Sequence, residues 1–201
     1  MSENPKQAQT RELLLQNGLE LFNRQGYHGT GLKEILAAAG VPKGSFYHYF
    51  DSKEHFAVEI IHHYRALEFK RWESKIKGSE GDRLAEMRRC ISTLIDEYDA
   101  QEQKVGCLIA NLSGELAACS PYFRSAIQAS SEEVLDLMEA DFATAQQQGS
   151  VRRDLPPRAL ACLFWDAWQG AMLRMKVNRS TTPLRQVAEL LFDNLLKAPH
   201  N

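Results

Sequence analysis

The chain has 201 residues, of which 44% are hydrophobic and 25% charged, the composition of a globular protein with room for a sizeable core. Its net charge of −2 argues against a protein that binds nucleic acid through an overall basic surplus. No apolar run approaches the ~18 residues of a membrane-spanning helix, and the four cysteines are too widely spaced for a zinc motif or a disulfide framework. We therefore expect a cytoplasmic protein with reduced thiols, without cofactor, bound metal or membrane contact.

The first forty residues predict a long helix followed by a short one. Apolar residues recur at helical spacing through residues 14–22, and Gly26 is placed to end this helix. Thr30 can cap a short helix over about residues 32–38, which ends at a tight break containing Gly40. Strand signals are nearly absent here and in the rest of the chain, so the sequence predicts an all-α fold.

Two further helices are predicted around the aromatic stretch GSFYHYF. Pro42 suits the first turn of a short helix that runs to about Tyr49. Asp51 and Glu54 have the spacing of a capping box, which would open a long helix to about Ile76. Two short helices joined by a glycine-containing break, the second led by proline, are typical of a helix-turn-helix.

In a helix-turn-helix the second helix enters the DNA major groove while the first braces it. The apolar residues of the unit can form a small core: Leu14, Leu21, Phe22, Leu32, Ile35, Leu36, Ala39, Val41, Phe46 and Phe50. The residues left on the other face are candidate DNA contacts: Lys43, Gly44, Ser45, Tyr47 and His48. Lys53, at the start of the long helix, would add a phosphate contact. The alternative is that all the aromatic residues of this stretch belong to the core of a small bundle.

The rest of the chain predicts five more helices, separated by loops such as KGSEGD and GSVRRDLPP. Their approximate ranges are 82–101, 106–118, 121–148, 157–177 and 183–197. The natural boundary lies near residue 50. We therefore expect a three-helix DNA-binding domain over residues 1–50 and a helical effector-sensing and dimerisation domain over residues 51–201.

The run ILAAAGVPKGSFYHYFDSKEHF, with Thr30 before it and an upstream LF…GY, resembles the N-terminal signature of the TetR family of repressors. This resemblance implies a homodimer whose two helix-turn-helix heads bind a near-palindromic double-stranded DNA operator, and it places Thr30 with the DNA-binding residues. It also implies an effector site in the larger helical domain. The chain departs from the family pattern at Gly18, which should cost the first helix up to ~1 kcal/mol, and at Pro42, which removes one N–H that could meet a phosphate.

Apolar stripes on the last two predicted helices indicate how the dimer would form. The stripes comprise Leu160, Leu163, Phe164, Ala167, Ala171, Leu173, Val187, Leu190, Leu191 and Leu195. Two such helices from each subunit could pack as a four-helix bundle, and the alternative is a core within one chain. We favour the dimer because two heads must be held about one DNA turn, ~34–36 Å, apart.

Cys107 is the candidate sensor residue. It follows Gly106 at a predicted helix start, where the helix N-terminus and nearby Lys104 would favour the nucleophilic thiolate. The segments GCLIANLSGELA and GAMLRMKVNRS resemble the branch of TetR repressors that responds to electrophiles and oxidants, typified by the regulator of N-ethylmaleimide reductase. That resemblance places the sensing cysteine at Cys107 and a lysine, a possible partner for an oxidised sulfur, at Lys176. The alternative is that the cysteines are small buried apolar residues.

A conventional effector pocket competes with the thiol sensor. Aromatic residues that could line it are Trp72, Tyr98, Phe123, Phe164, Trp165 and Trp168. Plain core packing is the alternative for such a set. His55, Glu59 and His62 have a possible metal-ligand spacing on one helix face, but solvation or packing explains them better, and we assign no metal.

The sequence therefore predicts a dimeric DNA-binding transcriptional regulator that a small molecule or modification of Cys107 releases from its operator. Two other classes remain open. A helical thiol enzyme could use Cys107 on electrophiles, although no partner at a telling spacing accompanies the cysteine. A DNA-architectural protein without a sensor would show the basic surplus that is missing here.

Overall fold

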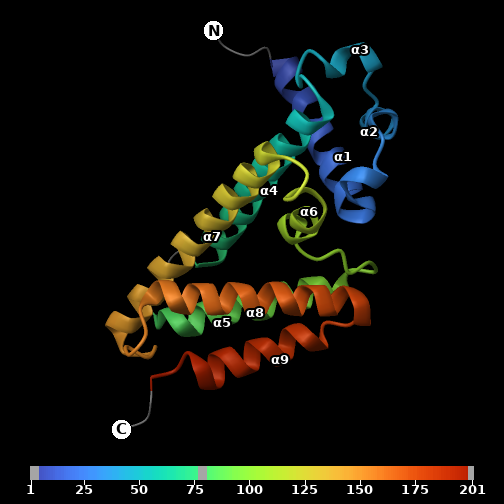
Figure 1. The fold of residues 1–201 in the computed structure, drawn as a ribbon. Coiled ribbons are helices and arrows are strands. Elements are labelled where there is room, and N and C mark those ends of the chain that lie inside the picture. Colours follow the sequence, from blue (N-terminus) through green and yellow to red (C-terminus); the bar gives the residue numbers. More distant parts are fainter. Residues whose placement is uncertain (1–4, 77–80, 199–201) are drawn as a thin grey trace. The chain divides into compact units, whose positions relative to one another are not determined.

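The computed structural model describes residues 5–76 and 81–198, and the regular structure in these ranges is helical apart from a single bridge between Val151 and Lys197 (Figure 1). The helices are α1 (Pro5–Gly29), α2 (Leu32–Ala39), α3 (Lys43–Phe46), α4 (Lys53–Ile76), α5 (Arg83–Ala100), α6 (Leu108–Leu116), α7 (Pro121–Gln148), α8 (Pro157–Asn178) and α9 (Thr182–Leu190). One π-helical turn, η1 (Leu191–Leu195), follows α9 directly. The predicted all-α fold is confirmed.

The chain divides into two compact units. The N-terminal unit comprises Met1–Glu68 and Cys107–Ser130, so it contains α1 to α3, most of α4, α6 and the start of α7. The C-terminal unit comprises Phe69–Gly106 and Ser131–Asn201, with α5, α8 and α9. This is a division by packing, and the functional boundary expected near residue 50 stays a prediction.

Two predicted helix caps are wrong by one residue. The N-cap of α2 is Gly31, whereas the hydroxyl of Thr30 donates a hydrogen bond to the carbonyl of Gly26 at 2.7 Å. At the start of α4 the cap is Ser52, whose Oγ accepts the N–H of His55 at 3.0 Å, in place of the Asp51 and Glu54 capping box. A hydroxyl one residue nearer the helix outcompetes the carboxylate because Ser Oγ reaches the third N–H of the helix from the cap position.

Of two predicted helix ends, one moved. The helix that Gly26 was predicted to end is interrupted there, where the backbone takes a φ of 74° and a ψ of 175°, and a short helical stretch beyond this kink runs to Gly29. The last helix, expected to reach residue 197, changes at Leu190 into the π-helical turn. The π-helical turn lies inside an apolar pattern that looked continuous in the sequence.

The core of the N-terminal unit is a cluster of phenylalanine rings that joins three parts of the chain. Phe46 from α3, Phe50 from the following turn and Phe56 from α4 are each 1% exposed or less, and the Phe50 and Phe56 ring centroids are 4.7 Å apart. Gly18 lets α1 approach this cluster, because an added Cβ would lie 2.5 Å from the Phe56 ring. The glycine that departs from the family pattern therefore has a packing role that offsets its helix-propensity cost.

The C-terminal unit is built around α8, which packs alongside α9 (Figure 1), and α9 in turn packs against α5. Phe142, Phe164 and Phe192 fill its centre with exposed fractions of 1% or less. At its edge, burial raises the pKa of Asp141, although the hydrogen bond from Trp72 Nε1 and the nearby Arg83 act in the opposite direction. No helix in residues 5–76 or 81–198 is long and apolar enough to cross a membrane.

Candidate functional site

The helix-turn-helix separates its aromatic residues into a buried set and an exposed set. Phe46 is 1% exposed, whereas its neighbour Tyr47 is 57% exposed. Lys43 and His48 are also exposed, and Ser45 is half-buried at the same surface. A Cβ at exposed Gly44 would meet no atom within 4 Å, so the backbone there is open to close approach by a ligand. The predicted outward face of α3, defined as Lys43, Gly44, Ser45, Tyr47 and His48, is therefore a real surface of this unit.

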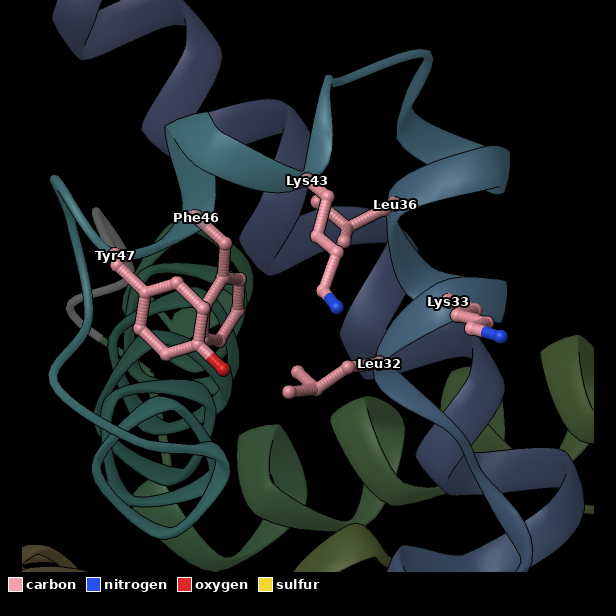
Figure 2. A pocket seen from close by; sticks show the side chains of 6 residues that line it. All are labelled: Leu32, Lys33, Leu36, Lys43, Phe46 and Tyr47. Carbon is pink, nitrogen blue, oxygen red and sulfur yellow. The ribbon is translucent and has the colours of Figure 1, made fainter.

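A small pocket opens between α2 and α3 beside this face (Figure 2). Leu32, Leu36 and Phe46 supply its apolar walls, and Lys33, Lys43 and Tyr47 complete the lining. Figure 2 shows the Lys43 ammonium and the Tyr47 hydroxyl directed to the same side of the pocket as Leu32. Donor groups beside an apolar floor suit the methyl groups and phosphates at the edge of a DNA groove.

Two residues predicted to contact DNA have hydrogen-bond partners within the N-terminal unit. Thr30 is 1% exposed, and its hydroxyl donates a hydrogen bond to the Gly26 carbonyl. The Lys53 ammonium donates to the Tyr27 carbonyl at 2.6 Å and lies 4.1 Å from the centre of the Tyr27 ring. Burial lowers the pKa of Lys53, and the charge of Glu115 partly offsets that effect. Both side chains brace the helix-turn-helix, Thr30 from a buried position and Lys53 from a half-buried one, and their contacts to DNA stay predictions.

Glu115 is a residue of this site that sequence reasoning missed. Its Oε2 accepts the backbone N–H of Tyr27 at 3.0 Å and that of His28 at 3.3 Å, across 88 and 87 residues of chain. Both contacts lie within the N-terminal unit, at the bend of α1. No spacing rule in a single sequence pairs residues so far apart. The glycine at position 26, which can adopt a positive φ, was the one sequence feature that marked this backbone as unusual.

Cys107 lies at the predicted helix start, as the N-cap of α6, and it is 5% exposed. Cys119, in the turn after α6, is the exposed thiol among the described cysteines. Lys104, expected to stand near the sulfur, instead donates to three carbonyls at the end of α5: those of Tyr98, Asp99 and Gln101. This arrangement is a lysine cap for α5, because the last carbonyls of a helix lack partners within it.

The predicted partner of the sulfur, Lys176, is an exposed residue near the end of α8. Its aliphatic stem passes Gly106, where an added Cβ would lie 3.2 Å from Lys176 Cδ. Gly106 and Lys176 belong to the C-terminal unit, and Cys107 begins the second segment of the N-terminal unit. Pairing of Cys107 with Lys176 therefore stays a prediction.

The six candidate pocket aromatics are divided between the two units. Phe164 and Trp168 stack along α8 with ring centroids 6.2 Å apart, and Tyr98 is buried on α5. Trp165 is half-buried on the same helix α8. Phe123 belongs to the N-terminal unit, where its ring packs edge-on to Tyr27. An effector pocket lined by these residues stays a prediction.

The predicted metal-ligand spacing on α4 brings no cluster together. His55 Nδ1 accepts the N–H of Asp51, and His62 is exposed. Within residues 5–76 and 81–198 no group of three or more His, Cys, Asp or Glu side chains is arranged to hold a metal ion.

A buried aromatic core, two short helices and an outward donor face on the second define a helix-turn-helix DNA-binding protein. Comparison with protein families agrees. A model described as bacterial regulatory proteins, tetR family, matches residues 14–60, and one described as tetracyclin repressor-like, C-terminal domain, matches residues 83–191.

Individual relatives match over nearly the whole chain. The HTH-type transcriptional repressor DhaR of Mycobacterium sp. (strain GP1) is 34% identical over 191 residues, 95% of this chain and 94% of that protein. The HTH-type transcriptional repressor NemR of Escherichia coli (strain K12) is 32% identical over 175 residues, 87% of this chain and 88% of that protein. The crystal structure of reduced E. coli NemR aligns with a TM-score of 0.87 and 30% identity, covering 96% of this chain and 100% of that one.

The chain belongs to the TetR family of transcriptional regulators. The family assignment predicted from residues 21–56 is confirmed, and the helical thiol enzyme that the sequence left open is excluded, because the family consists of DNA-binding regulators.

Proposed function

We propose that the protein is a homodimeric transcriptional repressor that leaves its operator when a small electrophile modifies Cys107. The observation that carries the DNA-binding part is the split between buried Phe46 and exposed Tyr47, which leaves the donors of α3 outside. Two relatives of similar length are named as repressors, which supports repression over activation. Lys43, Gly44, Ser45, Tyr47 and His48 would make the contacts to the duplex.

The C-terminal unit offers the surface for a second copy. Leu163 and Leu173 on α8 and Leu190 on α9 are 41%, 51% and 52% exposed, while Leu160 and Phe164 on α8 are fully buried. When an α-helix buries one apolar face and exposes a second, the exposed apolar face marks a surface that a partner covers. Pairing of α8 and α9 with their counterparts would bury these leucines in a symmetric interface.

Cys107 would serve as the sensor because it is the N-cap of α6, so that a group added to its sulfur acts directly on that helix. The thiolate is the form of a cysteine that attacks an electrophilic carbon. With an electron-poor alkene such as a maleimide, the thiolate sulfur adds to one alkene carbon, the neighbouring carbon takes a proton from water, and no oxidant is needed. The adduct adds bulk at a residue that is only 5% exposed, so α6 would shift to accommodate it.

Release from DNA would follow from geometry. Two heads fit one face of a duplex only when their separation matches the helical repeat, ~34–36 Å. A shift of α6 that tilts each head would break this match. A coupling free energy of about 1–3 kcal/mol between sensor and DNA would change operator affinity by roughly 5–150-fold, which is sufficient for a switch.

A mobility-shift assay tests this function directly. The probe is the duplex that the wild-type protein selects from a random library, measured with and without one equivalent of N-ethylmaleimide. We expect release of the wild type and of Cys119→Ser, the control for the exposed thiol, and no release of Cys107→Ser. Release of Cys107→Ser by the reagent would contradict the sensor role, and failure to prefer any duplex over random DNA would contradict operator recognition.

A further inference from the structure

The bend of α1 is held by a carboxylate that comes from α6. Glu115 Oε2 accepts both the Tyr27 and the His28 N–H, and α6 packs directly against α1. Gly26 makes this approach possible, because a Cβ there would overlap Glu115 Oε1. Gly26 also has a φ of 74°, a conformation that other residues rarely adopt. The backbone at residues 26–28 is therefore shaped to receive this one side chain.

The same short segment is tied from the other side to the DNA-binding helices. The Lys53 ammonium, at the start of α4, bonds the Tyr27 carbonyl at 2.6 Å. The Thr30 hydroxyl bonds the Gly26 carbonyl at 2.7 Å, directly before α2 begins. Gln25 reaches Glu34 on α2 at 2.8 Å. Any displacement of residues 26–28 is thus passed to α2, which packs on α3.

Two further contacts connect the segment after α6 and the start of α7 to α4 and to residue 27 of α1. The Ser120 hydroxyl bonds Glu54 on α4 at 2.5 Å, and the Phe123 ring lies 5.3 Å from the Tyr27 ring. These contacts fix where the C-terminal end of α6 lies within the N-terminal unit. Glu115 is the one charged side chain of α6, and it accepts two backbone hydrogen bonds from α1.

We propose that Glu115 is a positioning residue for operator binding: its carboxylate fixes the bend of α1 and so sets the orientation of α2 and α3. The proposal rests on the proposed function only in taking α3 as the DNA-contacting helix. It also supplies a route for the sensor, because Cys107 and Glu115 lie at opposite ends of α6. A rigid helix that moves at one end carries its other end with it.

Two conservative substitutions of Glu115 separate the effect of side-chain length from the effect of side-chain charge. Glu115→Gln keeps the length of the side chain and an acceptor oxygen but loses the charge. Glu115→Asp keeps the charge but draws the carboxylate back by about 1.5 Å, one bond length. Glu20→Ala, an exposed site on α1, is the control for loss of a negative charge from the same unit.

The measurements are the affinity for the duplex selected by the wild type, the affinity for a random duplex of the same length at the same salt, and hydrogen exchange at the Tyr27 and His28 amides. We expect Glu115→Asp to bind the selected duplex about tenfold more weakly, to bind random DNA within twofold of the wild type, and to exchange both amides faster. Glu115→Gln and Glu20→Ala should stay within about threefold of the wild type on the selected duplex.

Wild-type affinity of Glu115→Asp for the selected duplex would overturn the proposal. So would a loss of affinity in Glu115→Gln as large as in Glu115→Asp, because either result would show that the length of the side chain does not matter. An equal loss on selected and random DNA would also overturn it, since it would indicate general damage to the unit. If the wild type itself prefers no duplex, operator recognition fails instead, and unchanged exchange of both amides in Glu115→Asp then counts against Glu115 separately.

Discussion

The two units of the chain expose opposite kinds of surface. The N-terminal unit buries Phe46 and presents Lys43, Tyr47 and His48, whereas the C-terminal unit buries Phe164 and still presents leucines on α8 and α9. Exposure of lysine and histidine side chains to water is favourable because water hydrogen-bonds them. Exposure of several leucine side chains is unfavourable because their apolar surface is not buried. The polar face therefore suits a charged, hydrated duplex, and the apolar face suits a second copy of the chain.

Charged substitutions in the apolar surface of α8 and α9 should change the affinity for DNA the most. Leu173→Glu combined with Leu190→Glu should convert the protein to a monomer, because each charge would have to be buried without a partner in the interface. Loss of bivalent binding should lower affinity for the selected duplex by at least about 100-fold. Light scattering after size exclusion gives the mass, and fluorescence anisotropy gives the affinity.

Leu67→Glu is the matched control for that double variant, since Leu67 is 42% exposed but lies on α4 in the N-terminal unit. It should remain dimeric. A Leu173→Glu/Leu190→Glu protein that keeps the wild-type mass would show that the exposed leucines are not the dimer surface.

The next effect separates the two neighbouring aromatics of the N-terminal unit. Phe46→Ala should lower the free energy of unfolding by about 3–5 kcal/mol, because Phe46 is 1% exposed within the ring cluster. Tyr47→Ala should change that free energy by no more than about 0.5 kcal/mol. Urea unfolding followed by circular dichroism measures both, and similar losses for the two variants would refute the division between core and surface.

A smaller effect is expected on DNA binding from the polar face itself. Lys43→Ala and Tyr47→Ala should each weaken binding to the selected duplex about five- to tenfold without changing the mass of the protein. Lys43→Ala should also reduce the slope of log affinity against log salt by about 1, because one phosphate contact is lost. Lys70→Ala, an exposed α4 lysine of the C-terminal unit, should leave both quantities unchanged.

The smallest effect concerns a buried acid of the C-terminal unit. Burial raises the pKa of Asp141 in the folded state, so the folded protein holds this proton more tightly than the unfolded chain does. The free energy of unfolding should therefore fall as pH rises from the ordinary aspartate pKa through the raised one. Asp141→Asn keeps an acceptor for Trp72 and should be more stable than the wild type at pH 7, with a flatter pH profile. Thermal melts between pH 4 and pH 7 measure this, and a wild-type profile in the variant would contradict it.

The elements that the sequence predicts well are those set by local spacing. The helix-turn-helix, the burial of Phe46 beside exposed Tyr47, and the start of α6 at Cys107 all follow from patterns within a few residues. The contact of Lys53 with the Tyr27 carbonyl was not foreseen, because a lysine at a helix start has the same local pattern whether it meets a phosphate or a carbonyl of its own chain.

The parts that escaped prediction depend on contacts across the fold. Glu115 meets Tyr27 across 88 residues, and Gly18 is explained only by the Phe56 ring pressed against it. Such pairs are set by tertiary packing, which leaves no periodic trace in a single chain. They are also the contacts through which one helix can act on another.

In the proposed function, two copies of the α3 face bind one duplex together. The most decisive measurement is the mass of the complex with the selected duplex, by sedimentation at concentrations near the dissociation constant. We expect two chains on each duplex, with protected stretches about one helical turn apart on one side of the DNA. A single chain bound to each duplex at full affinity would contradict it.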